Sequence, residues 1–245
     1  MIAAFILLLA LGLGACAPGA GGGPAASAIA PADPLEETNR RILAFNLRLD
    51  DAVFRPLAVF YRDALGNWTR TRIRNVLDNL NQPAVAANSL LQGRPLESAQ
   101  TTLRFVFNST AGLGGMFDLA QFGGPPRVVR DFGETLYVWG LPDGPYLMVP
   151  ILGPSNPREL TGTITDGFLN PANYFIPVSI NLGRTAVEGL DEREQNIETL
   201  DEIRTGSLDV YARLRSLWQQ HRDAQLGRTS GEALEVLEDP GAPPR

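Results

Sequence analysis

The sequence predicts an all-α protein whose helices form a single domain. Apolar residues recur every three or four positions over most of the central part of the chain, which is the spacing of one face of a helix. No two apolar runs have the alternation and the turn residues that a β-hairpin needs. The chain has 245 residues, of which 44% are hydrophobic, so it is long enough to bury a core as one large domain or two small ones.

The first predicted helix begins at Asp33 or Thr38, because either side chain can cap a helix and Pro34 suits a first helical position. We expect Arg55-Pro56 to break or kink this helix before a second apolar group at 57–61. The apolar stripe of the helix consists of Leu35, Ile42, Phe45, Leu49 and Val53.

Further helices are predicted downstream. One covers 68–80, and Pro83 is expected to separate it from a short apolar helix at 84–91. A helix at 95–107 follows, and the last apolar stripe lies at 208–218.

The stretch 112–157 differs from the rest because glycine, proline and aromatic residues are frequent in it. An apolar run at 147–152 could form a strand, but Pro145, Pro150 and Pro154 argue against one. The number of aromatic residues argues against disorder. We therefore expect an irregular, glycine-hinged segment that contacts lipid. The alternative is a loop packed over the core.

The N-terminus has the pattern of a secretory signal. Residues 2–13 are almost wholly apolar, which suits a signal peptide and is too short for a membrane-spanning helix. The run ends in Leu13-Gly14-Ala15-Cys16, which resembles a bacterial lipobox, so Cys16 is the predicted site of acylation. Ala17 follows the cysteine, and a residue other than Asp there resembles lipoproteins of the outer membrane.

These features divide the chain into four parts. Residues 1–15 are the predicted signal peptide, and 16–32 are the acylated cysteine and a flexible tether rich in Ala, Gly and Pro. The helical domain is predicted to cover 33–225, and the acidic tail 226–245 to be disordered.

The amino-acid composition excludes several classes of enzyme chemistry. The net charge is −6 and all 21 basic residues are Arg, so nucleic acid is not an expected partner and lysine chemistry is impossible. One Cys and one His exclude the multi-Cys and multi-His metal sites, and no metal or cofactor is predicted. Arg70, Arg72 and Arg74 are interpreted as a solvated face, with phosphate contact as the alternative.

Motifs spread over 33–222 resemble, taken together, the MlaA family of outer-membrane lipoproteins. They include Asp33-Pro-Leu-Glu36, Asn39-Arg40, Phe45-Asn46, Asn75-Val-Leu-Asp-Asn-Leu80, Leu90-Leu-Gln-Gly93, Asn108-Ser-Thr110, Asp131-Phe-Gly133, Trp139-Gly140, Gly144-Pro-Tyr146 and Leu152-Gly-Pro-Ser155. Two positions depart from the family pattern: Pro142 interrupts a frequent Gly-x-Gly step, and Glu134 stands where Gln is common.

The resemblance implies a lipid-transport protein and no enzymatic activity. Such proteins form an all-helical ring in the inner leaflet of the outer membrane, on its periplasmic side, associated with a trimeric porin. An amphipathic channel lets misplaced phospholipids leave the outer leaflet, and a soluble periplasmic lipid carrier receives them. This transport maintains the lipid asymmetry of the outer membrane.

The resemblance also suggests functional residues. Phe45 and Asn46 are expected in the first membrane-embedded helical element, where they help set the closed state of the channel. Gly140, Gly144, Pro145 and Tyr146 are expected to form a hairpin that borders the channel.

Two other classes of function stay open from the sequence. One is a membrane-tethered lipid hydrolase that uses His221 with a serine and an acid, although no Gly-x-Ser-x-Gly motif is present. The other is a structural lipoprotein that scaffolds an envelope complex.

Overall fold

The computed structural model describes residues 33–118, 120 and 123–228. The predicted signal peptide, Cys16 with its tether, and residues 229–245 of the tail lie outside the described residues.

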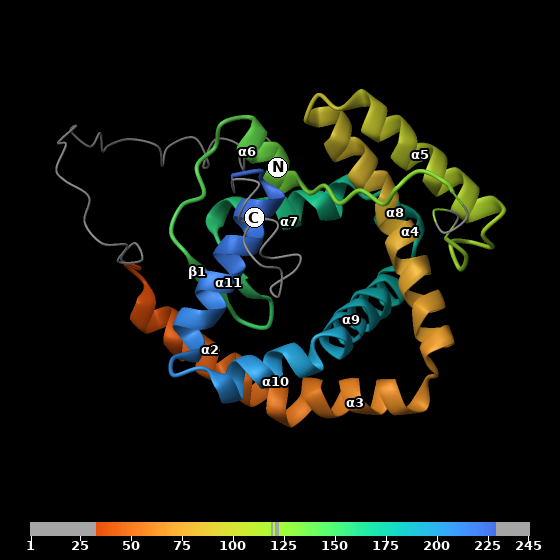
Figure 1. Ribbon diagram of the computed structural model, residues 1–245. Helices are drawn as coiled ribbons and strands as arrows, with labels where there is room; N and C mark the ends of the chain where they lie inside the picture. Colours follow the sequence, from red (N-terminus) through yellow and green to blue (C-terminus); the bar gives the residue numbers. More distant parts are fainter. Residues whose placement is uncertain (1–32, 119, 121–122, 229–245) are drawn as a thin grey trace, which may run out of the picture. The chain divides into compact units, whose positions relative to one another are not determined.

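Helices make up most of the described chain, which confirms the predicted fold class (Figure 1). They are, in order, α2 (Glu36–Leu49), the π-helix η1 (Asp50–Phe54), α3 (Arg55–Ala64), α4 (Asn67–Leu91), α5 (Pro95–Thr110), α6 (Phe132–Val138), α7 (Pro157–Leu169), α8 (Ala172–Phe175), α9 (Val178–Gln195), α10 (Ile197–Gly206) and α11 (Val210–Gln225). Two short strands, β1 (Leu147–Val149) and β2 (Gly153–Ser155), pair antiparallel. Among the described helices, none combines the length and the apolar character needed to cross a membrane.

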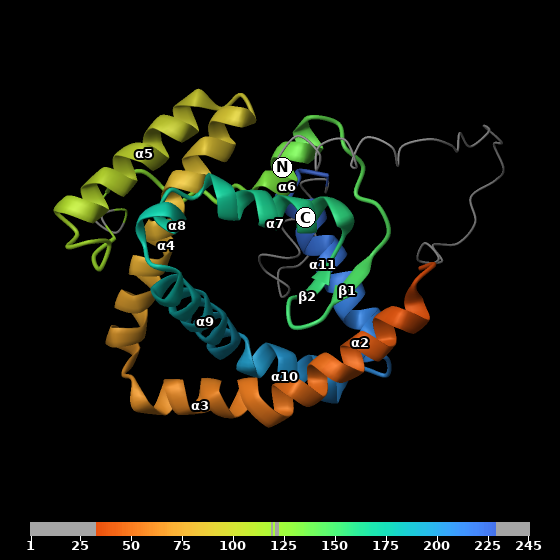
Figure 2. The ribbon, with the colours of Figure 1, turned by 180° about the vertical axis from the view of Figure 1, so that it is seen from behind.

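The elements of this unit contact one another in a closed circuit. Helix α3 packs along α9, α4 packs on α5, α9, α6 and α7, and α6 packs on α7. The circuit closes through α9, α10 and α11, because α11 contacts β2 and β1 contacts α2. Both ribbon views show this order, with α5 on the outer side of the circuit against α4 (Figures 1 and 2).

Residues 36–64 form a nearly continuous helical stretch. The helix start expected at Asp33 or Thr38 is wrong, because α2 begins at Glu36 after Leu35, and no side chain caps it. Asp33 instead stabilises the turn before the helix, since its Oδ1 accepts a hydrogen bond from the Leu35 backbone N–H at 2.9 Å. The boundary expected at Arg55-Pro56 is present as a change of helix type and not as a break, because η1 ends at Phe54 and α3 begins at Arg55. Pro56 therefore falls in the first turn of α3, and the change in helical geometry occurs before it, in η1.

Pro83 does not separate two helices, contrary to the sequence prediction. Helix α4 continues through it from Asn67 to Leu91. The Gln82 side chain donates to the Asp78 carbonyl oxygen at 3.3 Å, one turn earlier. Because α4 packs against four other helices, tertiary contacts hold it helical where the local sequence would interrupt it.

Ion pairs between arginines and buried carboxylates join α3 and α4 to α9. The Arg74 Nε donates to Asp191 Oδ2 at 2.8 Å, and the Arg62 Nε donates to Glu194 Oε1 at 2.9 Å. Arg70 also donates to Glu194, and both carboxylates are buried. The solvated face expected for Arg70, Arg72 and Arg74 is therefore wrong. Arg70 and Arg74 pair across the helix interface, and the Arg72 Nη1 donates to the Met116 carbonyl oxygen at 2.9 Å.

Polarity is distributed in an unusual way among the described residues. Buried polar or charged side chains outnumber buried hydrophobic ones, nineteen to ten. Large hydrophobic side chains are exposed on every helix from α2 to α9, including Phe60 on α3, Phe107 on α5 and Phe175 on α8. Water-soluble domains have the reverse arrangement, with apolar residues inside.

A close approach of two glycines forms the α6–α7 joint. A Cβ built on Gly162 would lie 2.3 Å from the Gly133 backbone N, so the helices touch through their backbones. Asp131 and Asn156 cap the two helices by accepting from backbone N–H groups at 2.6 Å and 2.8 Å. Arg222 of α11 donates to both carboxylate oxygens of Asp131, at 2.7 Å and 2.9 Å.

We predict that Gly162→Ala destabilises the protein. The new methyl group would push α7 away from Gly133, and overpacking of this kind costs about 1–3 kcal/mol. Gly167→Ala is the matched control, because it lies on the same helix with open space at its Cβ. Denaturant unfolding of the purified protein, followed by circular dichroism, measures both. Equal midpoints for the two variants would show that the helices do not approach as described.

A second prediction concerns the pH dependence of stability. Burial favours the neutral form of Asp131, but the Arg222 guanidinium and the Glu134 N–H outweigh it and lower the pKa of this carboxyl. A lowered pKa stabilises the fold above the unfolded pKa of about 3.9, and this contribution disappears as the pH falls through the folded pKa. Asp131→Asn should therefore cost about 1–3 kcal/mol at pH 7 and progressively less below about pH 4. Unfolding curves of both proteins across this range test the prediction, and a pH-independent loss for Asp131→Asn would contradict it.

Candidate functional site: the junction of α2 and the hairpin

A β-hairpin covers 147–155, directly after the segment 140–146 in which a hairpin was expected. Leu147 to Val149 pair with Ser155 to Gly153, so the strand doubted in the sequence exists. The prolines are tolerated because of where they lie. Pro150 is in the turn, and Pro154 faces Met148, whose N–H points away from β2 and donates to the Asn39 side chain. The missing N–H of Pro154 is thus not needed for the strand pair.

Residues 140–146 are a loop and not the expected hairpin. Gly140 ends α6 with a positive φ of 89°, and its N–H donates to the Tyr137 carbonyl at 2.8 Å. The Leu141 N–H donates to the Leu136 carbonyl at 3.0 Å, which completes a Schellman motif. Gly144 turns the chain again with a φ of 75°, and the exposed Pro145 leads to β1. The helix end and the two glycine turns displace the hairpin to 147–155.

Asn39 of α2 holds one part of the hairpin. Its Nδ2 donates to the Tyr146 carbonyl at 3.0 Å, and its Oδ1 accepts from the Met148 N–H at 2.9 Å. The side-chain amide thus satisfies the free edge of β1 as a neighbouring strand would. Asn39 is 2% exposed, so its loss would leave buried backbone groups without partners.

Asn46 holds the turn of the hairpin in the same way. Its Nδ2 donates to the Val149 carbonyl and its Oδ1 accepts from the Ile151 N–H, each at 2.9 Å. Ile151 has a φ of 69°, a strained conformation that these two bonds help to fix. Asn39 and Asn46 are seven residues apart and share one face of α2. We call the two side chains the asparagine clamp.

The residues predicted for the site lie in different environments. Phe45 is exposed on α2, although its neighbour Asn46 contacts the hairpin. Tyr146 is buried in a core cluster with Leu43, Met148 and Tyr211, so its ring contacts protein. Burial raises the pKa of Tyr146.

A second contact holds the loop that precedes the hairpin. Asp143 pairs with Arg158, whose side chain is 1% exposed, and accepts from the Arg228 Nη2 at 3.0 Å. The hydrogen bond from Arg228 lowers the pKa of Asp143, with burial opposing it. The loop is thus fixed at Asp143 by α7 and the segment after α11, and the hairpin is fixed by α2.

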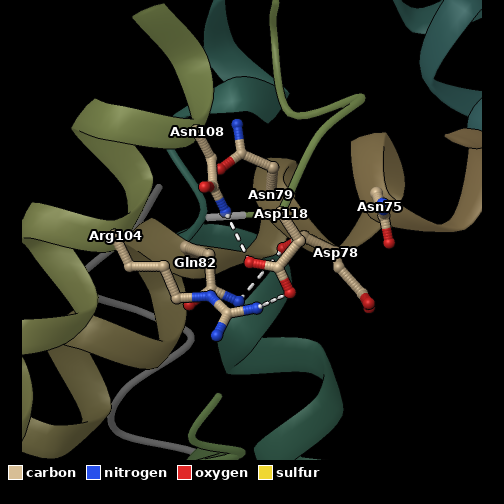
Figure 3. A pocket seen from close by; sticks show the side chains of 7 residues that line it. All are labelled: Asn75, Asp78, Asn79, Gln82, Arg104, Asn108 and Asp118. Atoms are coloured by element: carbon tan, nitrogen blue, oxygen red, sulfur yellow. Dashed lines mark hydrogen bonds and ion pairs between the residues drawn. The ribbon is translucent and has the colours of Figure 1, made fainter. Parts of the chain in front are cut away.

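A small polar cavity lies between α4 and α5 (Figure 3). Arg104 donates to Asp118 at 2.6 Å, and Asn79 donates to the Ser109 hydroxyl at 2.8 Å. The cavity measures about 10 Å³, which is room for a single water at most. It is a polar joint between two helices and too small for a lipid.

The catalytic alternative has little structural support at its proposed residue. His221 is exposed on α11, and its Nε2 lies 3.0 Å from the Gln225 side-chain nitrogen. The ring of His221 therefore contacts a side-chain amide, whereas the histidine of a catalytic triad contacts a serine hydroxyl. Within the described part of the chain, no three His, Cys, Asp or Glu side chains are placed to hold a metal ion.

Sequence reasoning missed Asn39 and Asp143 as site residues. The seven-residue spacing of Asn39 and Asn46 on one helix face was a usable signal, because two asparagines on an otherwise apolar stripe need partners. Asp143 gave no such signal, since its partners lie 15 and 85 residues away in the sequence.

Comparisons with known proteins agree on one family. The chain matches the model for MlaA lipoprotein over residues 31–225. It is 33% identical over 214 residues to the intermembrane phospholipid transport system lipoprotein MlaA of Escherichia coli strain K12, covering 86% of this chain and 83% of that protein. It is 36% identical over 195 residues to an uncharacterised protein of Rickettsia bellii, covering 79% of this chain and 76% of that one.

The fold is also similar to a solved structure, described as the structural basis for maintenance of bacterial outer membrane lipid asymmetry. The two chains superpose with a TM-score of 0.72 and are 33% identical, over 80% of this chain and 99% of the solved one. The family model spans the whole circuit of helices and the asparagine clamp. This chain belongs to the MlaA lipoprotein family.

Proposed function

We propose that this protein transports phospholipids and so maintains the lipid asymmetry of the outer membrane. In the proposed cycle, phospholipids misplaced in the outer leaflet pass through an amphipathic channel within the circuit of helices. A soluble periplasmic lipid carrier then receives them. The names of its relatives support phospholipid transport, and the physical features below support the finer steps.

The distribution of polarity is the observation that carries the proposal. Phe60 and Phe175 are 70% and 87% exposed, and many other large apolar side chains are exposed around the circuit. Each Å² of apolar surface that is exposed to water costs about 25 cal/mol of transfer free energy, and contact with lipid removes this cost. Buried charges, in contrast, are paired across helix interfaces, as hydrocarbon surroundings require. These features favour helices embedded in one leaflet.

Transport of a phospholipid needs no reactive group. The path has to offer polar contacts to the headgroup and apolar contacts to the chains, and no bond is broken. A lipid hydrolase would need an activated nucleophile, which the surroundings of His221 do not favour. A purely structural lipoprotein is the other alternative, and the tests below distinguish it.

We propose that Cys16 carries the lipid anchor on the periplasmic side of the outer membrane. Several acyl chains on one cysteine would hold the protein firmly, since each buried methylene contributes about 0.8 kcal/mol. The trimeric porin and the periplasmic carrier belong to this proposal as partners, on the strength of the family alone.

We propose further that the junction of α2 and the hairpin keeps the channel closed. Asn46 fixes the hairpin turn through two hydrogen bonds, while the exposed Phe45 is free to contact lipid. Gly140, Gly144 and Pro145 shape the loop that leads to the hairpin, and Tyr146 anchors it in the core. The loop and hairpin would border the path of the lipid.

Deleting Phe45 and Asn46 together should change the amount of phospholipid in the outer leaflet, because the channel would lose the contact that keeps it closed. Removing two residues rotates the rest of α2 by about 200°, so no asparagine would face the hairpin turn. Asn46→Ala should produce part of the effect, since it removes the two bonds alone, and Phe45→Ala is the control for the lost aromatic ring. Chemical labelling of surface phospholipid in whole cells measures the outcome. An unchanged outer leaflet at normal protein abundance would contradict the role of the clamp.

Cys16→Ser should leave the protein without acyl chains and displace it from the outer membrane. A serine hydroxyl cannot replace the thiol that a lipobox supplies for acylation. Membrane fractionation followed by mass spectrometry of the mature N-terminus tests this directly. A mutant that still carries fatty acid would reject the lipobox, and normal surface lipid in cells that lack the protein would favour a structural role.

A further inference from the structure

A charged recess lies between the η1–α3 turn and α10. Its volume is about 430 Å³, within the range of small-molecule sites, and it is lined by Asp51, Arg55, Pro56, Asp201, Arg204 and Thr205. The recess stands out because the neighbouring side chains on α3 and η1, Val53 and Leu57, are exposed and apolar.

Charges of opposite sign alternate around the recess. The Arg55 Nη2 donates to Asp201 Oδ2 at 2.7 Å, and Arg204 donates to both carboxylate oxygens of Asp51 at 2.7 Å. All four side chains are partly exposed, so a ligand can reach them. The two acidic and two basic side chains balance, so the recess carries no net charge.

An ion pair beside the recess contacts one of its lining residues. Arg193 of α9 donates to both oxygens of Asp50, at 2.6 Å and 2.9 Å, and Arg204 lies 3.6 Å from the same carboxylate. Asp50 and Asp51 are consecutive, and the wider turn of the π-helix η1 lets both face α9 and α10. The charged groups are thereby held in place before any ligand binds.

We propose that this recess binds the headgroup of a zwitterionic phospholipid, in which an ammonium group is joined to a phosphate. The phosphate would accept hydrogen bonds from Arg55 and Arg204, and the ammonium would donate to Asp51 and Asp201. The acyl chains would run along the exposed Val53 and Leu57. This inference rests on the proposed function and names the class of lipid that the protein prefers.

The chemistry favours a zwitterion over an anionic lipid. A ligand with both charges can insert between the existing pairs and leave every charge with a partner. An anionic headgroup such as phosphatidylglycerol would engage the arginines and leave two carboxylates unpaired, which is costly near hydrocarbon. The hydrogen bonds from Arg55 and Arg204 lower the pKa of Asp201 and Asp51 respectively, so both carboxylates are ionised at neutral pH.

The first test uses the unmodified protein. Phosphatidylethanolamine with a photoreactive headgroup, in vesicles that contain the full-length lipoprotein, should cross-link to peptides of η1 and α10. Peptide mapping by mass spectrometry locates the cross-link. Cross-links confined to other elements would overturn the inference. It would also be overturned if soluble glycerophosphoethanolamine prevented the cross-link as well as unlabelled phosphatidylethanolamine does at the same concentration, because the site would then not be one for a lipid.

The second test compares two lipids and two pairs of substitutions. Transfer of phosphatidylethanolamine out of vesicles should fall by about fivefold or more in Asp51→Asn/Asp201→Asn, as expected for the loss of two partly exposed ion pairs. Transfer of phosphatidylglycerol should rise in this variant, because the two carboxylates that an anionic headgroup leaves unpaired are gone. Arg55→Gln/Arg204→Gln should slow the transfer of both lipids. Glu37→Gln/Arg41→Gln, which removes an exposed ion pair on α2, is the control and should slow neither.

The outcomes separate this inference from the proposed function. If the unmodified protein transfers neither lipid, the proposed function fails. If it transfers both lipids and the acidic variant keeps the phosphatidylethanolamine rate of the unmodified protein, the headgroup site fails and transport stands.

Discussion

Pairing of arginines with carboxylates at the helix interfaces is the interaction on which the rest of the structure depends. Helices α3 and α4 meet α9 through Arg62, Arg70 and Arg74, which share Asp191 and Glu194. The same chemistry joins α11 to α6 and α7, where Arg222 pairs with Asp131 and Glu159. In water such pairs contribute little, because desolvation offsets the attraction. Next to hydrocarbon such pairs are more strongly stabilising, because an unpaired charge there cannot be solvated by water.

The closed circuit follows from this constraint. A helix in this circuit can have an exposed apolar face and polar contacts with its partner helices. Lipid can cover the apolar face, and the partner helices pair the polar groups. The junction of α2 and the hairpin applies the same rule to a strand edge. The free backbone groups of β1 and the turn are bonded by the side-chain amides of Asn39 and Asn46, which leaves apolar Ile151 and Leu152 exposed at the tip. A proposed path for lipid would thus be bordered by a segment held by four hydrogen bonds.

Local signals in the sequence predicted the helices but not how they join. The stripes at 68–80 and 95–107 lie in α4 and α5, as expected from their period. Pro83 was misjudged because packing on several helices outweighs the lost hydrogen bond. The hairpin was doubted because its prolines seemed to break the strand, whereas one lies in the turn and the other at a position without ladder bonds. The partners of Arg74 and Asn46 lie more than 100 residues away, so no local pattern could reveal them.

If the helices are embedded in one leaflet, their exposed apolar faces contact lipid. Spin labels at positions 60 and 175 of the membrane-bound protein test this, compared with a label at position 37 on an exposed charged site. Oxygen, which concentrates in hydrocarbon, should relax the labels at 60 and 175 more strongly than a water-soluble nickel complex does. The label at 37 should respond mainly to nickel. Nickel-dominated relaxation at all three positions would place the apolar faces in water and contradict the embedding of the helices in the membrane.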